Sequence, residues 1–124
     1  MAYGPLAHGL LTGTFTADTT FQEQDWRATG KAFGLPIFER ENFIQNVAVV
    51  DRLKVLAREN GRSVAQLAIA WVLRRPEVTT ALIGARKPSE IDDSARAADW
   101  RLSPADLDRT EEIMRGAAGT VVAG

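Results

Sequence analysis

The segment VTTALIGARKPSE, residues 78–90, decides the fold. Residues 78–83 are apolar or β-branched, which predicts a buried strand, and Gly84 ends the run. Pro88 then suits the first turn of a helix, because its missing N–H and its fixed φ are both tolerated there. A strand that leads directly into a helix predicts an α/β fold, in which helices cover parallel strands.

The residues before this segment extend the alternation of strands and helices. Residues 1–6 predict the end of a strand, and residues 12–36 predict a long ordered loop anchored by its aromatic side chains. In residues 38–60, apolar side chains at spacings of three and four predict a helix with one apolar stripe. That stripe consists of Phe43, Val47, Val50, Leu53 and Ala57.

Capping residues place the remaining helices. Ser63 and Gln66 form a capping box, in which each side chain can bond the other residue's backbone N–H. The helix that they start has a predicted buried stripe of Val64, Leu67, Ala68, Trp71 and Val72. Further helices are predicted over residues 88–97 and from Ser103 to Gly116, followed by a loose tail over residues 117–124.

Composition limits the possible functions of the 124 residues, which we interpret as one domain or a piece of one. The net charge of −1 gives no reason to expect nucleic-acid binding or attraction to an anionic membrane. The chain has no cysteine, which excludes disulfides and thiolate metal sites and fits a cytoplasmic protein. No signal peptide, membrane-spanning stretch or metal-ligand spacing is visible, so we expect no metal site.

Two loops could present backbone N–H groups to a phosphate. The first is YGPLAHGLLTG, residues 3–13, and the second is the strand-to-helix turn at residues 83–90. Gly84 has no Cβ, so a phosphate could approach the backbone, and the helix that begins near Pro88 offers a partial positive charge. Arg86 and Lys87 add cations beside this turn.

Three segments in order resemble the aldo-keto reductase family. Residues 3–13 resemble the family's segment at the end of strand 7, residues 65–73 the helix before strand 8, and residues 83–90 the turn after strand 8. The resemblance covers nearly all of residues 2–115 and implies a C-terminal portion of a (β/α)8 TIM barrel. The expected fold class is therefore α/β, a partial barrel of the last two β/α units that is rich in helix, with residues 1–124 as one C-terminal fragment.

The same resemblance implies an NADP(H) cofactor and a set of residues that bind it. Tyr3 would stack on the nicotinamide, the loop that follows would line the pyrophosphate path, and Arg27 would fold over the cofactor. The guanidinium of Arg86 would suit a ribose 2′-phosphate. The expected cofactor-binding residues are Tyr3, Gly4, Pro5, Leu6, His8, Gly9, Arg27, Ile83, Gly84, Ala85, Arg86, Glu90, Asp93 and Ser94.

Three of these positions depart from the family pattern. Gly4 stands where the family usually has Ser, Glu90 where Gln is common and Ser94 where Asn is common. Glu90 next to a phosphate would weaken its binding, because the two charges repel.

The family's catalytic tetrad of Asp, Tyr, Lys and His belongs to the first half of the barrel, and no residue of this chain matches it. Tyr3 and His8 are the only Tyr and His, and neither lies at a tetrad position. We therefore expect no catalytic residue here and no carbonyl reduction by the isolated chain. The parent enzyme would transfer hydride between NADPH and an aldehyde or ketone, and only it would bind the carbonyl substrate.

Two strands cannot close a barrel, so the strand at residues 78–83 is expected to expose both edges. Self-association would cover them. Two alternatives to a reductase portion stay open, namely a non-catalytic module that binds a nucleotide or a partner, and a truncated chain without activity. A helix-turn-helix DNA-binding domain is disfavoured by the neutral charge and the predicted strand.

Overall fold

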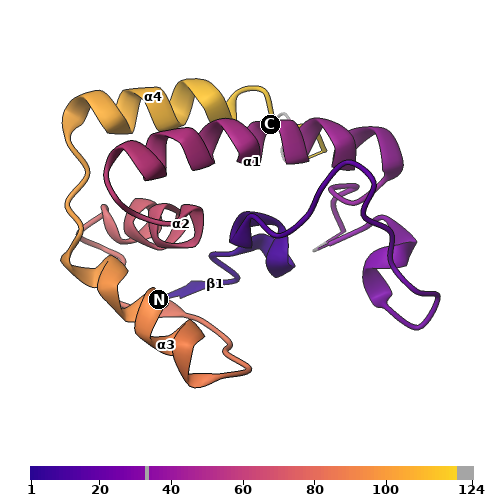
Figure 1. Ribbon diagram of the computed structural model, residues 1–124, viewed down its shortest axis with the longest axis horizontal. Coiled ribbons are helices and arrows are strands. Elements are labelled where there is room, and N and C mark those ends of the chain that lie inside the picture. Colours follow the sequence, from indigo (N-terminus) through magenta and orange to yellow (C-terminus); the bar gives the residue numbers. More distant parts are fainter. Residues whose placement is uncertain (33, 120–124) are drawn as a thin grey trace.

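A computed structural model of the chain describes residues 1–32 and 34–119. The long helix α1 (Arg40–Glu59) lies beside α4 (Pro104–Met114), and α2 (Val64–Leu73) packs beneath α1 (Figure 1). Strand β1 (Ala2–Tyr3), strand β2 (Ala81–Leu82) and helix α3 (Pro88–Ala95) form the opposite side. The 3₁₀ helices are η1 (Ala7–Thr12), η2 (Trp26–Thr29) and η3 (Arg96–Asp99).

The two strands pair with each other in parallel. Ala2 lies opposite Ala81 and Tyr3 opposite Leu82, and the Ala2 N–H donates to the Thr80 carbonyl at 2.7 Å. The expectation that β2 exposes both edges is therefore wrong, because β1 covers one of them. The strand is also shorter than residues 78–83 and is not buried, since Leu82 is 44% exposed. A parallel strand becomes buried when other elements cover both faces of its sheet, and the sheet among the described residues consists of β1 and β2 alone.

Helix α1 supplies the centre of the core. Its predicted stripe is confirmed, because all five of the stripe's side chains are buried, namely those of Phe43, Val47, Val50, Leu53 and Ala57. The capping box of α2 is confirmed as well, with Gln66 N donating to Ser63 Oγ and Ser63 N donating to Gln66 Oε1, each at 3.1 Å. The sequence was sufficient to predict the stripe and the capping box, because each depends on residues within one helix or one cap.

Helix α2 buries a different side from the predicted one. Ile69 and Ala70 join Val64 and Leu67 in the interior, whereas Ala68, Trp71 and Val72 are only partly buried. The helix is apolar on nearly every side, so its sequence does not decide which face meets α1. Packing against α1 and η3 decides it instead.

Aromatic side chains anchor the loop at residues 12–36, as predicted. The Phe21 ring makes edge-on contacts with Phe15, Phe38 and Phe43 at centroid distances of 5.4–5.7 Å. Phe33, another predicted anchor, lies outside the described residues. The loop contains η2 and an isolated bridge between Ala32 and Leu35, so part of it has regular hydrogen bonding.

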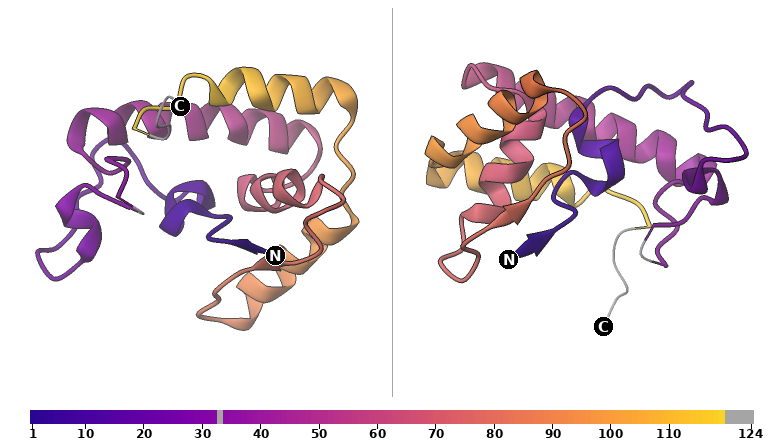
Figure 2. Two further views of the ribbon diagram at one scale, coloured as in Figure 1. Left: turned by 180° about the vertical axis from the view of Figure 1, so that it is seen from behind. Right: turned by 90° about the horizontal axis from the view of Figure 1, so that it is seen from below.

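Residues 117–119 are not loose, in contrast to the prediction for residues 117–124. Asn46 of α1 is 2% exposed and holds them, because its amide donates to the Ala118 carbonyl at 2.9 Å and accepts from the Ala118 N–H at 2.7 Å. The two opposite views in Figures 1 and 2 both show this segment returning to α1. Residues 120–124 lie outside the described residues.

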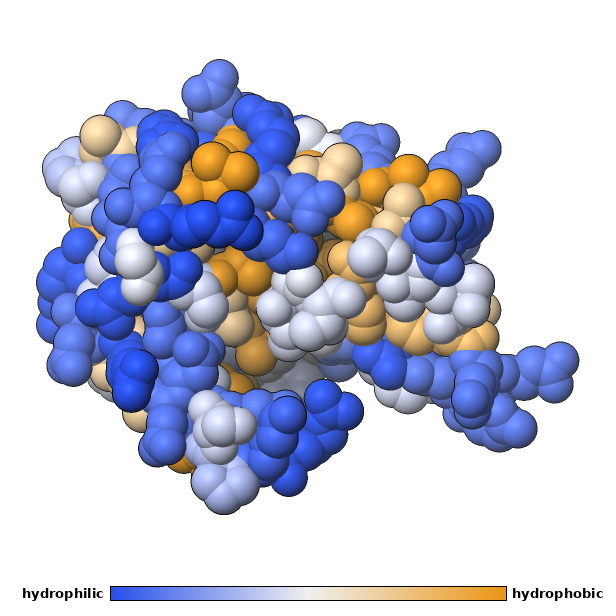
Figure 3. Space-filling model, viewed as in Figure 1, coloured by the Kyte–Doolittle hydropathy of each residue, from blue (hydrophilic) through white to orange (hydrophobic). Residues whose placement is uncertain are grey.

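The described part of the chain contains no helix that is long and apolar enough to cross a membrane. On the face shown in Figure 3, apolar side chains are interrupted repeatedly by hydrophilic ones.

Candidate functional site

The parallel pairing of β1 and β2 brings the loops that follow the two strands to the same edge. One loop runs into η1 and the other into α3, and together they border a groove of about 830 Å³. Loops at the carboxyl ends of barrel strands are where active sites and phosphate sites form in this architecture.

The structure brings all the predicted cofactor-binding residues except Ala85 to this groove. Ala85 instead lines an adjoining apolar trough between α2, β2 and α3, which shares Ile83, Glu90 and Ser94 with the groove. Their role in binding a cofactor stays a prediction. The groove is lined by Tyr3, Gly4, Pro5, Leu6, His8, Gly9, Arg27, Ile83, Gly84, Arg86, Glu90, Asp93 and Ser94, and also by Thr12, Thr14, Phe15, Ala65, Leu82 and Ser89.

The additional lining residues show what sequence reasoning missed. Thr12, Thr14 and Ser89 carry hydroxyls that can donate to or accept from a ligand. Ser89 lies within the quoted turn and directly follows Pro88 at the first position of α3, so its place at a helix N-terminus could have identified it. The contribution of Ala65 from α2 depends on tertiary packing, for which the sequence offers no pattern.

The first wall of the groove is a tight loop with unusual backbone angles. Ala7 and His8 have φ of 48° and 56°, and Gly9 follows with 97°. Non-glycine residues with positive φ are strained, so surrounding contacts must hold them. Part of that support is local, because the Ala7 N–H donates to the Gly4 carbonyl at 3.0 Å and the Gly9 N–H to the Leu6 carbonyl at 3.1 Å.

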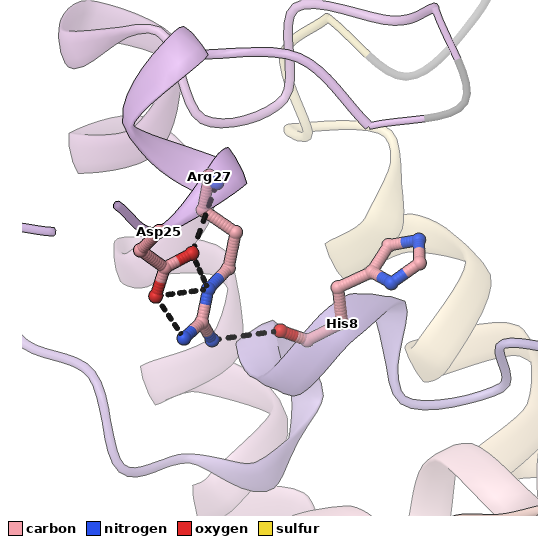
Figure 4. Close-up of polar contacts among 3 residues, drawn as sticks. All are labelled: His8, Asp25 and Arg27. Carbon is pink, nitrogen blue, oxygen red and sulfur yellow. Dashed lines mark hydrogen bonds and ion pairs between the residues drawn. The ribbon is translucent and has the colours of Figure 1, made fainter. Parts of the chain in front are cut away.

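Arg27 supplies support from a distant part of the chain. Its Nη1 donates to the His8 carbonyl at 3.2 Å, while its Nε and Nη2 donate to the Asp25 carboxylate (Figure 4). The guanidinium also lies over the Phe21 ring, 4.7 Å from its centroid. The residue therefore fixes the shape of this wall through contacts within the protein.

The hydrogen bonds from Arg27 lower the pKa of Asp25 to about 2, and those to Asp25 raise the pKa of Arg27. Both groups are consequently charged over the whole physiological range. The His8 ring points away from the guanidinium in Figure 4 and meets Trp26 edge-on at 4.7 Å. His8 thus contributes to this wall of the groove through its backbone carbonyl and the packing of its ring.

The second wall is the turn at residues 83–87 and the start of α3. A Cβ on Gly84 would meet no described atom within 4 Å, and the φ of Gly84 lies outside the region that favours glycine. Neither the backbone nor packing within the described protein therefore requires glycine at this position. The space beside it is open to a ligand, and no side chain caps the N-terminus of α3.

Two carboxylates of α3 are already engaged within the protein. Glu90 accepts the Arg86 N–H at 2.7 Å, and its other oxygen lies 3.5 Å from Arg86 Nη2. These contacts lower the pKa of Glu90. Asp93 accepts from Ser63 Oγ at 3.0 Å, and both its side chain and its carbonyl accept from Gln66 Nε2. Asp93 thereby ties α3 to the capping box of α2.

The wall residues fit the phosphate end of a dinucleotide at the open backbone of Gly84 and at the uncapped start of α3. The Glu90 carboxylate opposes an anion at this wall. The order of strand, turn and helix, together with a groove at the carboxyl ends of parallel strands, is what a portion of a parallel β/α barrel has.

Residues 1–115 match the model of the aldo/keto reductase family, and the chain belongs to that family. It is 36% identical over 107 residues to the aldo-keto reductase YhdN of Bacillus subtilis, a match that covers 86% of this chain and 31% of that protein. It is 29% identical over 111 residues to the NADH-specific methylglyoxal reductase of Escherichia coli, with coverage of 90% and 32%.

A solved structure agrees with the fold. The glycerol dehydrogenase of Gluconobacter oxydans superposes with a TM-score of 0.85 at 34% identity, covering 98% of this chain and 36% of that one. The chain therefore spans about a third of the length of these relatives. The resemblance to aldo-keto reductases and the partial TIM barrel predicted from the sequence are both confirmed.

Proposed function

We propose that the groove binds the phosphate-bearing part of NADP(H), and that in a complete barrel it serves hydride transfer between NADPH and an aldehyde or ketone. The observation that carries this proposal is the convergence of two loops at the carboxyl ends of adjacent parallel strands, one with open space at Gly84. Family membership supports a nicotinamide cofactor.

Each wall has a distinct part in this proposal. Tyr3, which is 74% exposed at the groove, would stack on the nicotinamide ring. The Ala7–Gly9 backbone and Gly84 would border the pyrophosphate, and Arg86 would receive the 2′-phosphate as a charge-assisted hydrogen-bond donor. The bound cofactor supplies the hydride, and these residues bind and orient it.

Substitution of Gly84 tests the binding role. Gly84→Val would fill the open space without meeting a described atom at its Cβ, so we expect unchanged thermal unfolding but at least tenfold weaker NADPH binding. Titration followed by nucleotide fluorescence measures this, with NADH in parallel because one relative is named as NADH-specific. Equal NADPH affinity in the variant and the wild type would contradict the proposed site.

We propose further that the purified 124-residue chain does not reduce carbonyls, because none of its residues matches the catalytic tetrad of the family. NADPH oxidation in the presence of an aldehyde measures this directly. Turnover that co-purifies with the chain would show that a proton donor has been overlooked. Saturable NADPH binding without turnover is also what a non-catalytic nucleotide-binding module would give, whereas a truncated chain without activity would bind nothing.

A second copy of the chain is the partner that we propose for the apolar trough of about 330 Å³. Ile69, Leu73, Ile83 and Ile91 line it, next to the strand β2. Ile91 is 59% exposed at this trough, so association there would remove apolar area from water. For the parent enzyme we propose the cytoplasm, with which the absence of cysteine is compatible.

A further inference from the structure

Glu90 engages two groups of Arg86 that could otherwise bind a phosphate, the backbone N–H through a hydrogen bond and the guanidinium through an ion pair. Its carboxylate accepts the Arg86 backbone N–H at 2.7 Å and lies 3.5 Å from the Arg86 guanidinium. The Arg86 side chain is 92% exposed, whereas that of Glu90 is 31% exposed. The carboxylate is therefore settled against the turn, while the guanidinium extends into solvent. The Glu90 carboxylate thus lies where the second wall of the groove would hold the phosphate of a ligand.

We propose that Glu90 is a specificity-determining residue that disfavours the ribose 2′-phosphate and so limits the preference for NADPH over NADH. The inference rests on the proposed function, because it concerns the adenosine end of the same groove. A 2′-phosphate must either displace Glu90 from Arg86 or lie beside its negative charge, and both reduce affinity. A ribose 2′-hydroxyl carries no charge and can donate a hydrogen bond to the same carboxylate.

The charged residues next to Glu90 do not offer a simple alternative to it as the residue that disfavours the 2′-phosphate. Asp93 also lines the groove, but its carboxylate is held by Ser63 and Gln66 of α2. Lys87 follows Arg86 but is not among the residues that line the groove. Asp92 is exposed and lies outside the groove, two residues from Glu90 on the same helix. It therefore provides a matched control for the removal of one negative charge from α3.

Two small nucleotides isolate the effect of the 2′-phosphate. Adenosine 2′,5′-bisphosphate carries the group and adenosine 5′-monophosphate lacks it, and isothermal titration of the 124-residue chain gives both affinities. We expect Glu90→Gln to raise the affinity for the bisphosphate about fivefold, from the loss of one like charge at groove distance. The monophosphate should change less than twofold. Asp92→Asn should change the ratio of the two affinities less than twofold.

The possible failures are distinguishable. Binding of both nucleotides with an unchanged ratio in Glu90→Gln would overturn the role of Glu90 and leave the nucleotide site intact. An equal change in Asp92→Asn would also overturn it, since only general charge would then matter. No binding by any variant would overturn the proposed function and this inference with it.

The contact itself can be tested without a nucleotide. The amide resonance of Arg86 should shift with pH as the Glu90 carboxylate titrates, because that amide donates to it. The shift should disappear in Glu90→Gln and persist in Asp92→Asn. An Arg86 amide that is indifferent to pH in the wild type would show that Glu90 does not occupy this position.

Discussion

At the scale of single residues, the Asp25–Arg27 pair connects the aromatic loop to the groove. Arg27 bonds Asp25 on one side and the His8 carbonyl on the other, so one side chain joins segments that are far apart in the sequence. A strained loop retains its shape only where such contacts outweigh the strain. The pair therefore contributes to the groove without having to touch a ligand.

The low pKa of Asp25 makes this pair sensitive to acid in a defined range. The folded pKa, about 2, lies below the ordinary value of 3.8, so the pair's stabilisation is fully present above the unfolded pKa and is lost as pH falls through about 2. We expect the Asp25 carboxyl carbon to titrate with a midpoint near 2 in an NMR experiment. Arg27→Gln should return that midpoint toward 3.8. A wild-type midpoint already near 3.8 would refute the contact.

Local chemistry explains which site residues could be predicted. The turn residues Gly84 and Arg86 follow from the strand-to-helix pattern alone, since each is defined by its immediate neighbours. The contact of Arg27 with the His8 carbonyl joins residues nineteen positions apart, and no pattern in the sequence predicts it. The internal engagement of Asp93 by the capping box of α2 was missed for the same reason.

At the scale of secondary-structure elements, Asn46 links α1 to two separate segments. Besides its two bonds to Ala118, it donates to the Ile37 carbonyl at 3.1 Å. A buried amide that satisfies three backbone partners is costly to remove, because those partners lose their hydrogen bonds inside the protein.

Replacement of Asn46 by alanine should therefore lower the free energy of unfolding by about 2 kcal/mol. Chemical denaturation measures the change. Gln45→Ala is the matched control: its neighbouring amide is exposed and donates once, to the Gly116 carbonyl, so we expect a loss below about 1 kcal/mol. A loss below about 1 kcal/mol in Asn46→Ala as well would contradict the role of Asn46 in holding the segment after α4.

Elements differ in how far their sequences determine them. Helix α1 and the caps of α2 and α4 were predictable, because an apolar stripe or a cap is determined by residues that lie close together in the sequence. The strands were predicted too long, since the extent of a strand depends on the partner that supplies its hydrogen bonds. β1 is the first element of the chain and β2 follows α2, so their pairing joins segments far apart in the sequence and is a property of the assembled chain.

At the scale of the whole molecule, the chain has two surfaces of different character. The groove is bordered by polar loops and backbone turns, whereas the trough between α2, β2 and α3 is lined mainly by aliphatic side chains. In a complete barrel of this family, further strands would continue the sheet beside β2. A chain that carries two strands leaves that apolar area to be covered by other means.

Self-association of the 124-residue chain follows if a second copy covers the trough. Sedimentation velocity should show dimers or larger species at micromolar concentration, and Ile91→Lys should shift the distribution toward monomer, because a charge at the trough is costly to bury. Val55→Lys is the control, since Val55 is similarly exposed at 50% but lies on α1, away from the trough. Its oligomeric state should match the wild type. A wild-type chain that sediments as a single monomeric species and melts cooperatively would contradict the proposal, because the chain would then tolerate the exposed trough without a partner.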